Sequence, residues 1–294
     1  MDALNASALL EWWEGARIER DRFPWRSAGD PWHVLVSETM LVQTQADRVA
    51  QRYPLIVERF PTPAHLAAAP VGDLIALWAG LGYYRRAVAL HRAAVRIVEL
   101  HGGEVPEGLD DLLALPGVGA YTARAVLVFA FDAVAAPLDT NIRRVIVRAL
   151  GLANGSPREI QRAADELVRR HIEEKRVCPT PRMWNLALMD LGSTVCMARS
   201  PRCPECPLRT SCAWRAGGGP DPNASNRRKS PRYEGSNREI RGSIVRALAN
   251  GPKPSSEIAF SGAVAPGSAR VSGVVAGLIA EGLVLEESGV LRLP

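Results

Sequence analysis

Apolar residues recur at spacings of three and four along residues 1–216, which is the period of helices that bury one face in a core. Glycine or proline interrupts this pattern about every 12 to 20 residues, so we expect many separate helices. Runs in which apolar and polar residues alternate are scarce in this part of the chain. The pattern therefore predicts a mainly all-α fold.

Composition changes at residues 217–232, where glycine, proline, asparagine and serine gather beside a basic cluster, and we interpret this stretch as an exposed linker. Three helical patterns and a terminal hairpin are expected beyond it. They lie at about Arg238–Ala249, near Ser255, at about Ser268–Glu281, and at Leu283–Leu285 with Val290–Leu293. This order is similar to a small winged-helix module; a helical tail without its own function is the alternative.

Four cysteines lie close together near the end of the helical region, with the spacing C-x6-C-x2-C-x5-C. They are Cys196, Cys203, Cys206 and Cys212. Four thiolates on one short loop are the ligand set of a structural zinc or of a [4Fe–4S] cluster. Scattered thiols or two disulfides are the alternative, which such tight spacing in a reducing compartment disfavours. Cys178 stands apart, and we interpret it as an ordinary thiol.

The net charge of +5 and the pI near 9.2 agree with binding to a polyanion but do not establish it. No apolar stretch is long enough for a membrane span, and the N-terminus lacks the pattern of a signal peptide. We therefore expect a cytoplasmic protein with no membrane partner.

The segment Leu115–Gly119 reads L-P-G-V-G between two helical runs. Pro116 ends the first run, and Gly117 and Gly119 permit a sharp turn. The next helix then starts with unpaired backbone N–H groups beside glycine, where a phosphate can approach closely. The pattern is that of a helix-hairpin-helix, and a plain turn between helices is the alternative.

Two carboxyl groups occupy positions where chemistry is plausible. Glu38 lies in the middle of the predicted apolar stripe formed by Val34, Leu35, Leu41 and Val42. Burial should raise the pKa of Glu38 toward neutrality, as general-acid catalysis requires, unless the side chain is simply bonded to a neighbouring helix end. Asp139, in L-D-T-N, starts a helix; it is most simply an N-cap and can also face a pocket as a fixed negative charge.

The segment Gly80–Ala87, G-L-G-Y-Y-R-R-A, is a glycine-rich turn with two tyrosines and two arginines. Aromatic and basic side chains together can stack on bases and hold phosphates. An ordinary turn with a solvated basic face is the alternative.

These motifs, in this order, resemble the helix-hairpin-helix DNA glycosylase superfamily that includes endonuclease III, and most closely its adenine DNA glycosylases. The resemblance covers about residues 10–215. It rests on W-R at Trp25–Arg26, S-E-T-M-L-V-Q-T-Q at Ser37–Gln45, G-L-G-Y-Y-R-R-A, L-P-G-V-G-A-Y-T-A at Leu115–Ala123, L-D-T-N at Leu138–Asn141 and the cysteine loop.

The resemblance implies a two-lobed helical body that holds a [4Fe–4S] cluster rather than zinc. We expect a helical iron–sulfur domain of residues 1–30 with 132–216, and a helical domain of residues 31–131 that contains the hairpin. The linker of residues 217–232 and a small winged-helix-like domain of residues 233–294 then complete the chain.

The resemblance further implies base excision repair, in which adenine opposite 8-oxoguanine or guanine is flipped out of double-stranded DNA and its N-glycosidic bond is hydrolysed. We expect a monomer associated with the nucleoid. Glu38 would protonate the purine N7, and Asp139 would stabilise the oxocarbenium-like sugar. Tyr121 stands where bifunctional lyases carry a nucleophilic lysine, so we expect base removal without strand cleavage. Asn141 would orient groups beside the purine.

Other residues match positions that bind DNA in the family. Gln43 and Tyr83 match residues that wedge into the gap left by the flipped base, and Trp25 and Arg26 match part of the base pocket. The hairpin residues Leu115, Gly117, Val118 and Gly119 match the DNA-binding turn. The cysteine loop would present Arg199, Arg202 and Arg209 to the DNA backbone and take no part in redox chemistry.

Val42 and Leu186 depart from the family pattern at positions that hold the opposite strand and read the adenine edge. The C-terminal segment is also too short for the larger domain that recognises 8-oxoguanine in many members, so that selection would rest on the helical body or on the short module. Two alternatives stay open: a glycosylase that removes thymine or uracil opposite guanine, and a non-catalytic DNA-binding protein of the same fold. The joint presence of Glu38 and Asp139 speaks against the second.

Overall fold

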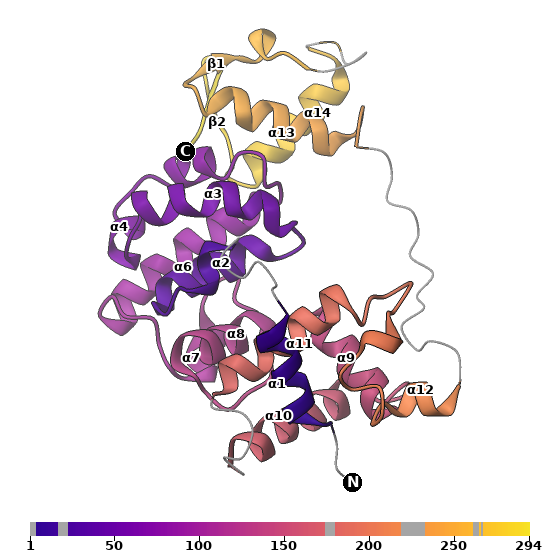
Figure 1. The fold of residues 1–294 in the computed structure, drawn as a ribbon. Helices are drawn as coiled ribbons and strands as arrows, with labels where there is room; N and C mark the ends of the chain where they lie inside the picture. Colours follow the sequence, from indigo (N-terminus) through magenta and orange to yellow (C-terminus); the bar gives the residue numbers. More distant parts are fainter. Residues whose placement is uncertain (1–3, 17–22, 174–179, 219–232, 261–264, 266) are drawn as a thin grey trace. The chain divides into compact units, whose positions relative to one another are not determined.

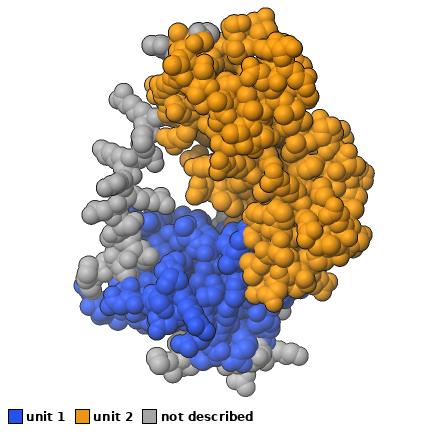
Figure 2. Space-filling view, turned by 180° about the vertical axis from the view of Figure 1, so that it is seen from behind, with its two compact units in different colours: residues 1–21, 119–228 blue, residues 22–118, 229–294 orange. Residues whose placement is uncertain are grey.

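The computed structural model describes residues 4–16, 23–173, 180–218, 233–260, 265 and 267–294 (Figure 1). Tertiary contacts group the chain into two compact units, residues 1–21 with 119–228 and residues 22–118 with 229–294 (Figure 2). One boundary falls between Val118 and Gly119, within L-P-G-V-G. The predicted four-part domain division stays a prediction, and Cys178 and most of the predicted linker lie outside the described residues.

The first unit is helical throughout its described residues. Its elements are α1 (Ala6–Gly15), α8 (Ala120–Phe131), α9 (Thr140–Leu150), α10 (Pro157–Glu173), α11 (Pro181–Thr194), the short 3-10 helix η3 (Cys203–Glu205) and α12 (Ala213–Gly217). Trp13 of α1, Ile142 and Ile146 of α9, and Trp184 of α11 belong to one buried core. Within that core the indole N–H of Trp13 donates to Oδ2 of Asp190 at 2.9 Å, so the buried carboxyl has a partner.

The second unit is also mostly helical, and α2, α4 and α5 pack against its helix α6. Its helices are η2 (Pro24–Arg26), α2 (Pro31–Leu41), α3 (Ala46–Arg59), α4 (Pro63–Ala67), α5 (Val71–Leu77), α6 (Arg85–His101) and α7 (Leu109–Ala114), followed by the C-terminal elements. Mostly helical architecture is therefore confirmed for both units. Among the residues that the structure describes, no helix is both long enough and apolar enough to cross a membrane.

Local sequence explains where several helices begin. Asp30 caps α2, Thr62 caps α4 and Thr180 caps α11, and each accepts a hydrogen bond from a backbone N–H of the first turn. In each case proline follows at the first helical position, where its missing N–H costs nothing. Gly102 ends α6 with a φ of 62°, which favours glycine. These helix boundaries are thus set by capping residues.

The C-terminal elements match the predicted helices and hairpin closely. They are α13 (Asn237–Leu248), β1 (Lys253–Pro254), the 3-10 helix η4 (Ser255–Glu257), α14 (Ala269–Ala280), β2 (Leu285–Glu287) and β3 (Val290–Arg292). The strands form an antiparallel sheet in the order β1-β3-β2, and β1 was not foreseen. α13 packs on α14 and also on α5, and Glu281 binds Arg241 at 2.5 Å and Arg85 of α6 at 3.1 Å. These elements therefore pack on α5 and α6 and belong to the second unit.

Candidate functional site

Glu38 lies on α2 and is buried, with 5% of its surface exposed. The predicted apolar stripe is wrong in one respect, because α2 ends at Leu41 and Val42 is 39% exposed beyond it. The helix is instead buried on nearly all sides from Trp32 to Met40, so helical periodicity could not show which face is inside. A carboxyl in this position is kept from bulk water, and its role as a proton donor stays a prediction.

Asp139 is the N-cap of α9, as predicted. Its Oδ1 accepts hydrogen bonds from the backbone N–H groups of Asn141 at 2.9 Å and Ile142 at 2.6 Å, and its Oδ2 accepts one from Nδ2 of Asn141 at 2.9 Å. Burial raises the pKa of the Asp139 carboxyl, and these bonds and the charge of Arg144 oppose part of that effect. The ionised carboxyl is therefore poorly hydrated, so a positive charge that forms beside it would be stabilised.

Arg144 joins the Asp139 region to the cysteine loop. Its guanidinium donates to Oδ1 of Asn141 at 2.9 Å and to the carbonyl of Cys196 at 2.7 Å. Gly192 of α11 lies so close that an added Cβ would be 2.6 Å from Cβ of Asn141, which explains the glycine. The position of the Asn141 side chain is thus fixed from two directions.

The predicted hairpin is present in the local backbone. α7 ends at Ala114, Leu115 is buried, and the amide of Val118 donates to the carbonyl of Leu115 at 3.1 Å. Gly117 has a φ of 78°, and an added Cβ would lie 2.6 Å from Cβ of Ala89 on α6. Gly119 is the N-cap of α8 without a side-chain bond, so its helix starts with accessible amides, and Tyr121 follows in the first turn.

The two predicted wedge residues share an uncommon backbone. Gln43 has a φ of 55° and Tyr83 a φ of 50°, a left-handed conformation that few non-glycine residues adopt. Both are exposed, and Tyr83 is 55% exposed, which is unusual for a large aromatic side chain. Strained and exposed residues of this kind are typical of functional surfaces.

Trp25 and Arg26 lie in the short helix η2, and both are partly buried. The Trp25 ring stacks on Phe23 with centroids 5.1 Å apart and meets the edge of Tyr53 at 5.8 Å. η2 also packs against α2, the helix that carries Glu38. This proximity supports their predicted place beside a base pocket, which stays a prediction.

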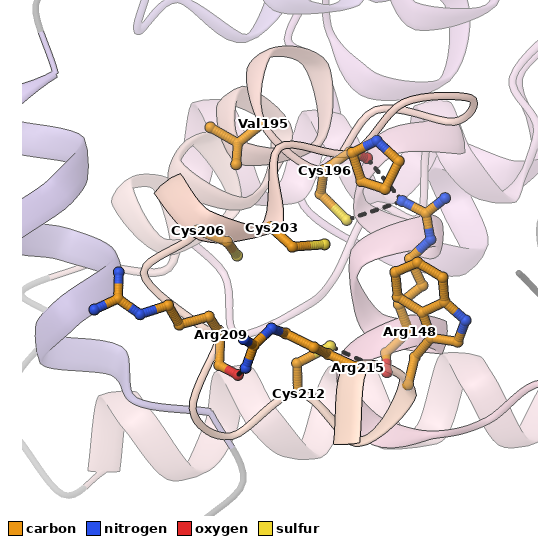
Figure 3. Close-up of a pocket in the computed structure, with 10 residues that line it drawn as sticks. Arg148, Val195, Cys196, Cys203, Cys206, Arg209, Cys212 and Arg215 are labelled. Atoms are coloured by element: carbon orange, nitrogen blue, oxygen red, sulfur yellow. Dashed lines mark hydrogen bonds between the residues drawn. The ribbon is translucent and has the colours of Figure 1, made fainter. Parts of the chain in front are cut away.

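The four predicted cysteine ligands line one cavity (Figure 3). Cys196 lies just after α11, Cys203 begins η3, Cys206 follows η3, and Cys212 is the N-cap of α12. All four are free thiols and partly buried. The structure therefore brings together the residues that the spacing singled out.

The four thiols are ligands of the type that binds a structural zinc ion or an iron–sulfur cluster. Within the described part of the chain no three His, Cys, Asp or Glu side chains are arranged to hold one metal ion. Both centres take four thiolate ligands, so the choice of an iron–sulfur cluster stays a prediction.

Burial raises the pKa of the Cys206 thiol to about 11 and also raises the pKa of Cys196, which a hydrogen bond from Arg148 partly opposes. Ligation requires thiolates, so binding of a metal centre here would release protons.

Arg148 holds the start of the cysteine loop and is only 1% exposed. It donates to Sγ of Cys196 at 3.2 Å and to the carbonyls of Met197 at 2.8 Å and Ala198 at 3.2 Å, and its guanidinium lies 4.9 Å from the Trp214 ring centroid. Sequence reasoning missed both Arg144 and Arg148. The available signal was their spacing of four, which places both arginines on one face of α9.

Several known proteins resemble this chain in sequence or fold. The family model of the HhH-GPD superfamily base excision DNA repair proteins matches residues 36–170. The chain is 41% identical to the adenine DNA glycosylase of Mycolicibacterium smegmatis over 86% of this chain and 83% of that protein. It is 36% identical to the thymine/uracil-DNA glycosylase of Pyrobaculum aerophilum over 68% and 86%. A solved thermostable thymine-DNA glycosylase matches 72% of this chain and 95% of its own, with a TM-score of 0.62 and 30% identity.

Proposed function

The chain belongs to the HhH-GPD superfamily of base excision DNA repair proteins, and from that membership we propose that it is an adenine DNA glycosylase that removes adenine mispaired with 8-oxoguanine or guanine. The single observation that carries the choice of adenine is the 41% identity to a protein of that activity over most of both chains. Double-stranded DNA is then the macromolecular partner, and the target base leaves the stack before the reaction.

Glu38 is the proposed general acid. A protonated carboxyl kept from bulk water can donate its proton to N7 of the adenine and turn the base into a neutral leaving group. Its burial on α2 supports this assignment. After the base has left, the same carboxylate is a base for the attacking water.

Asp139 is the proposed stabiliser of the positive charge that develops on the sugar. Its three hydrogen bonds at the start of α9 fix the direction of the carboxylate. Its burial strengthens the electrostatic attraction between the carboxylate and a nearby cation. Asn141 positions Oδ2 of Asp139, and Arg144 positions Asn141.

Tyr121 supports a monofunctional enzyme, because a phenol cannot form the Schiff base through which a lysine cleaves the strand. We further propose that Gln43 and Tyr83 fill the gap left by the base, that Trp25 and Arg26 line the base pocket, and that Leu115, Gly117, Val118 and Gly119 contact the DNA backbone. The exposure of Gln43 and Tyr83 and the open start of α8 support these assignments.

The cofactor is proposed to be a [4Fe–4S] cluster held by Cys196, Cys203, Cys206 and Cys212. When bound, it supplies a rigid anchor for the loop rather than redox chemistry. Arg199, Arg202 and Arg209 are exposed on that loop and are proposed to face DNA phosphates, although Arg202 also donates to the carbonyl of Thr194 and Arg209 to that of Pro204.

Single-turnover reactions on four duplexes test the proposal. The duplexes carry A opposite 8-oxoguanine, A opposite guanine, T opposite guanine and U opposite guanine, and strand breaks are scored with and without alkali. We expect release from the two adenine duplexes and breaks only after alkali. Breaks without alkali would overturn the monofunctional assignment, and release from only the T and U duplexes would overturn the choice of adenine.

A second candidate function, removal of thymine or uracil opposite guanine, is favoured by one specific observation. The chain resembles a thymine/uracil-DNA glycosylase over 86% of that protein, and a solved thymine-DNA glycosylase shares the fold at 30% identity. The same four duplexes separate the two functions.

A further inference from the structure

Arg86, in the first turn of α6, is bonded to the end of the helix that carries Glu38. One guanidinium nitrogen lies 2.9 Å from the carbonyl of Thr39, 2.7 Å from that of Met40 and 2.7 Å from that of Val42. The last carbonyls of a helix have no partner within the helix. Arg86 therefore satisfies acceptors that α2 leaves open where it ends.

The other terminal nitrogen of Arg86 extends the same contact to two loops. It donates to Oγ1 of Thr44 at 2.9 Å and to the carbonyl of Gly82 at 3.2 Å. Val42 and Thr44 flank Gln43, and Gly82 precedes Tyr83. The guanidinium carbon also lies 5.4 Å from the Tyr83 ring centroid. One side chain thus contacts the immediate neighbours of both left-handed residues.

This arrangement leaves Arg86 little capacity to bind DNA. Its two terminal nitrogens already serve five acceptors of the protein. The guanidinium carbon also lies 5.4 Å from the ring centroid of Trp78. Burial lowers the pKa of Arg86 to about 10, so the side chain is still charged at neutral pH. The sequence pattern had left open whether the arginines of this turn hold phosphates or form a solvated basic face.

We propose that Arg86 is a positioning residue that holds Gln43 and Tyr83 in the left-handed conformation in which both enter the duplex when the target base is flipped. Left-handed backbone at a residue with a side chain persists only where its surroundings fix it. Arg86 is the contact that the two segments share. The inference rests on the proposed function, because it assumes that these residues meet DNA.

Arg86→Lys is the informative change, because lysine keeps the charge but has one nitrogen where arginine has a planar fork. Arg96→Lys is the matched control, since Arg96 lies on the same helix, is exposed and makes one weak ion pair with Glu99 at 3.8 Å. Three quantities are measured for both variants: the fluorescence of 2-aminopurine placed beside the mispair, the single-turnover rate of base release, and the affinity for fully matched duplex.

We expect Arg86→Lys to lose most of the 2-aminopurine signal and to slow base release about tenfold or more, in step, as loss of one charge-assisted hydrogen bond implies. Affinity for matched duplex should stay close to that of the control, whereas the thermal midpoint should fall because several carbonyls lose their donor, so all assays are run well below it. Unchanged unstacking and release would overturn the proposal. A loss of matched-duplex affinity as large as the loss of base release would also overturn it, because Arg86 would then stabilise the fold of the whole unit rather than position Gln43 and Tyr83.

A readout in the free protein separates this inference from the proposed function. The chain has only 5 tyrosines, so labelling of tyrosine and glutamine gives a simple spectrum. Carbon chemical shifts of residues 43 and 83 should report left-handed backbone in the wild type and lose that signature in Arg86→Lys. Retained shifts would overturn the inference whatever base the enzyme removes. Loss of the shifts by a protein that releases no base would instead refute only the proposed function.

Discussion

Replacing Arg148 by methionine should free the start of the cysteine loop while keeping most of the volume of the side chain. The change removes hydrogen bonds to Sγ of Cys196 and to the carbonyls of Met197 and Ala198. The carbonyl of Cys196 keeps a bond at 2.7 Å from Arg144, and Ala198 is exposed, so water can replace a donor there. Loss of the hydrogen bond to the carbonyl of Met197 at 2.8 Å should therefore destabilise the loop most.

The size of the effect follows from these contacts. A hydrogen bond to a charged donor contributes about 1.5–3 kcal/mol. The guanidinium of Arg148 is only 1% exposed, so burying it costs desolvation free energy that methionine does not. Without a cluster, this difference offsets part of the stability lost with the hydrogen bonds. With a cluster bound, the thiolates bring negative charge next to the guanidinium, so the offset is smaller. We expect a net loss of about 1.5 kcal/mol, or about tenfold in the equilibrium that retains the cluster.

The iron content per chain measures how much cluster is retained. The rate at which a chelator bleaches the visible absorption measures how fast the cluster is lost. Arg209→Met is the control, because Arg209 lines the same cavity but is exposed and is bonded to the carbonyl of Pro204 at 2.9 Å. Arg148→Met should lose iron about tenfold faster than this control. Equal rates would refute the assignment of Arg148 as the anchor of the loop, and a wild type that contains zinc without iron would refute the cluster.

Three further substitutions test other parts of the structure. Glu38→Gln should slow adenine release by about 10²- to 10⁴-fold with little change in affinity for the mismatched duplex; equal losses in kinetics and gel-shift assays would indicate a structural carboxyl. Because burial raises the pKa of Asp139 above its value in the unfolded chain, the stability that this group contributes is present below the unfolded pKa and is lost as pH rises through the folded pKa. Asp139→Asn should therefore raise the thermal midpoint more at neutral than at acid pH, and a difference independent of pH would contradict this reasoning. Gly72→Ala would place a Cβ 2.2 Å from the carbonyl oxygen of Pro294 and should cost about 1–3 kcal/mol in denaturant unfolding, whereas Gly273→Ala meets no atom within 4 Å and should be neutral or stabilising.

Local chemistry accounts for what the sequence predicted well. Asp139 was expected to cap a helix, and it does, because a short acceptor next to an apolar run satisfies the first amides whatever the tertiary fold. The C-terminal helices were placed within a residue or two, since Ser236 and Ser268 cap them and apolar periodicity follows. The cysteine cavity follows from spacing alone, because the four thiols are separated by few residues.

Features fixed by distant packing were not accessible in this way. α2 is buried on nearly all sides, so its sequence carries no periodic signal, and the end of the predicted stripe at Val42 was wrong. The left-handed conformations of Gln43 and Tyr83 were not foreseen, because neither residue favours them. Arg86, which contacts the neighbours of both, is 42 residues from Thr44 in the sequence. Strand β1 is two residues long and exists only through its partner β3.

The basic residues show why net charge is a weak guide to a DNA-binding surface. Almost all of them are arginines, and a guanidinium can serve several carbonyls at once, as lysine cannot. Arg86, Arg144 and Arg148 use this capacity inside the protein, at helix ends and loop starts where carbonyls would otherwise lack donors. Their charges count toward the total of +5, yet their donors are directed at the chain itself. Charge that is free to meet phosphate must therefore be sought on exposed arginines such as Arg199, and substitution of such residues should weaken the salt dependence of DNA binding, whereas substitution of the internal ones should act through structure.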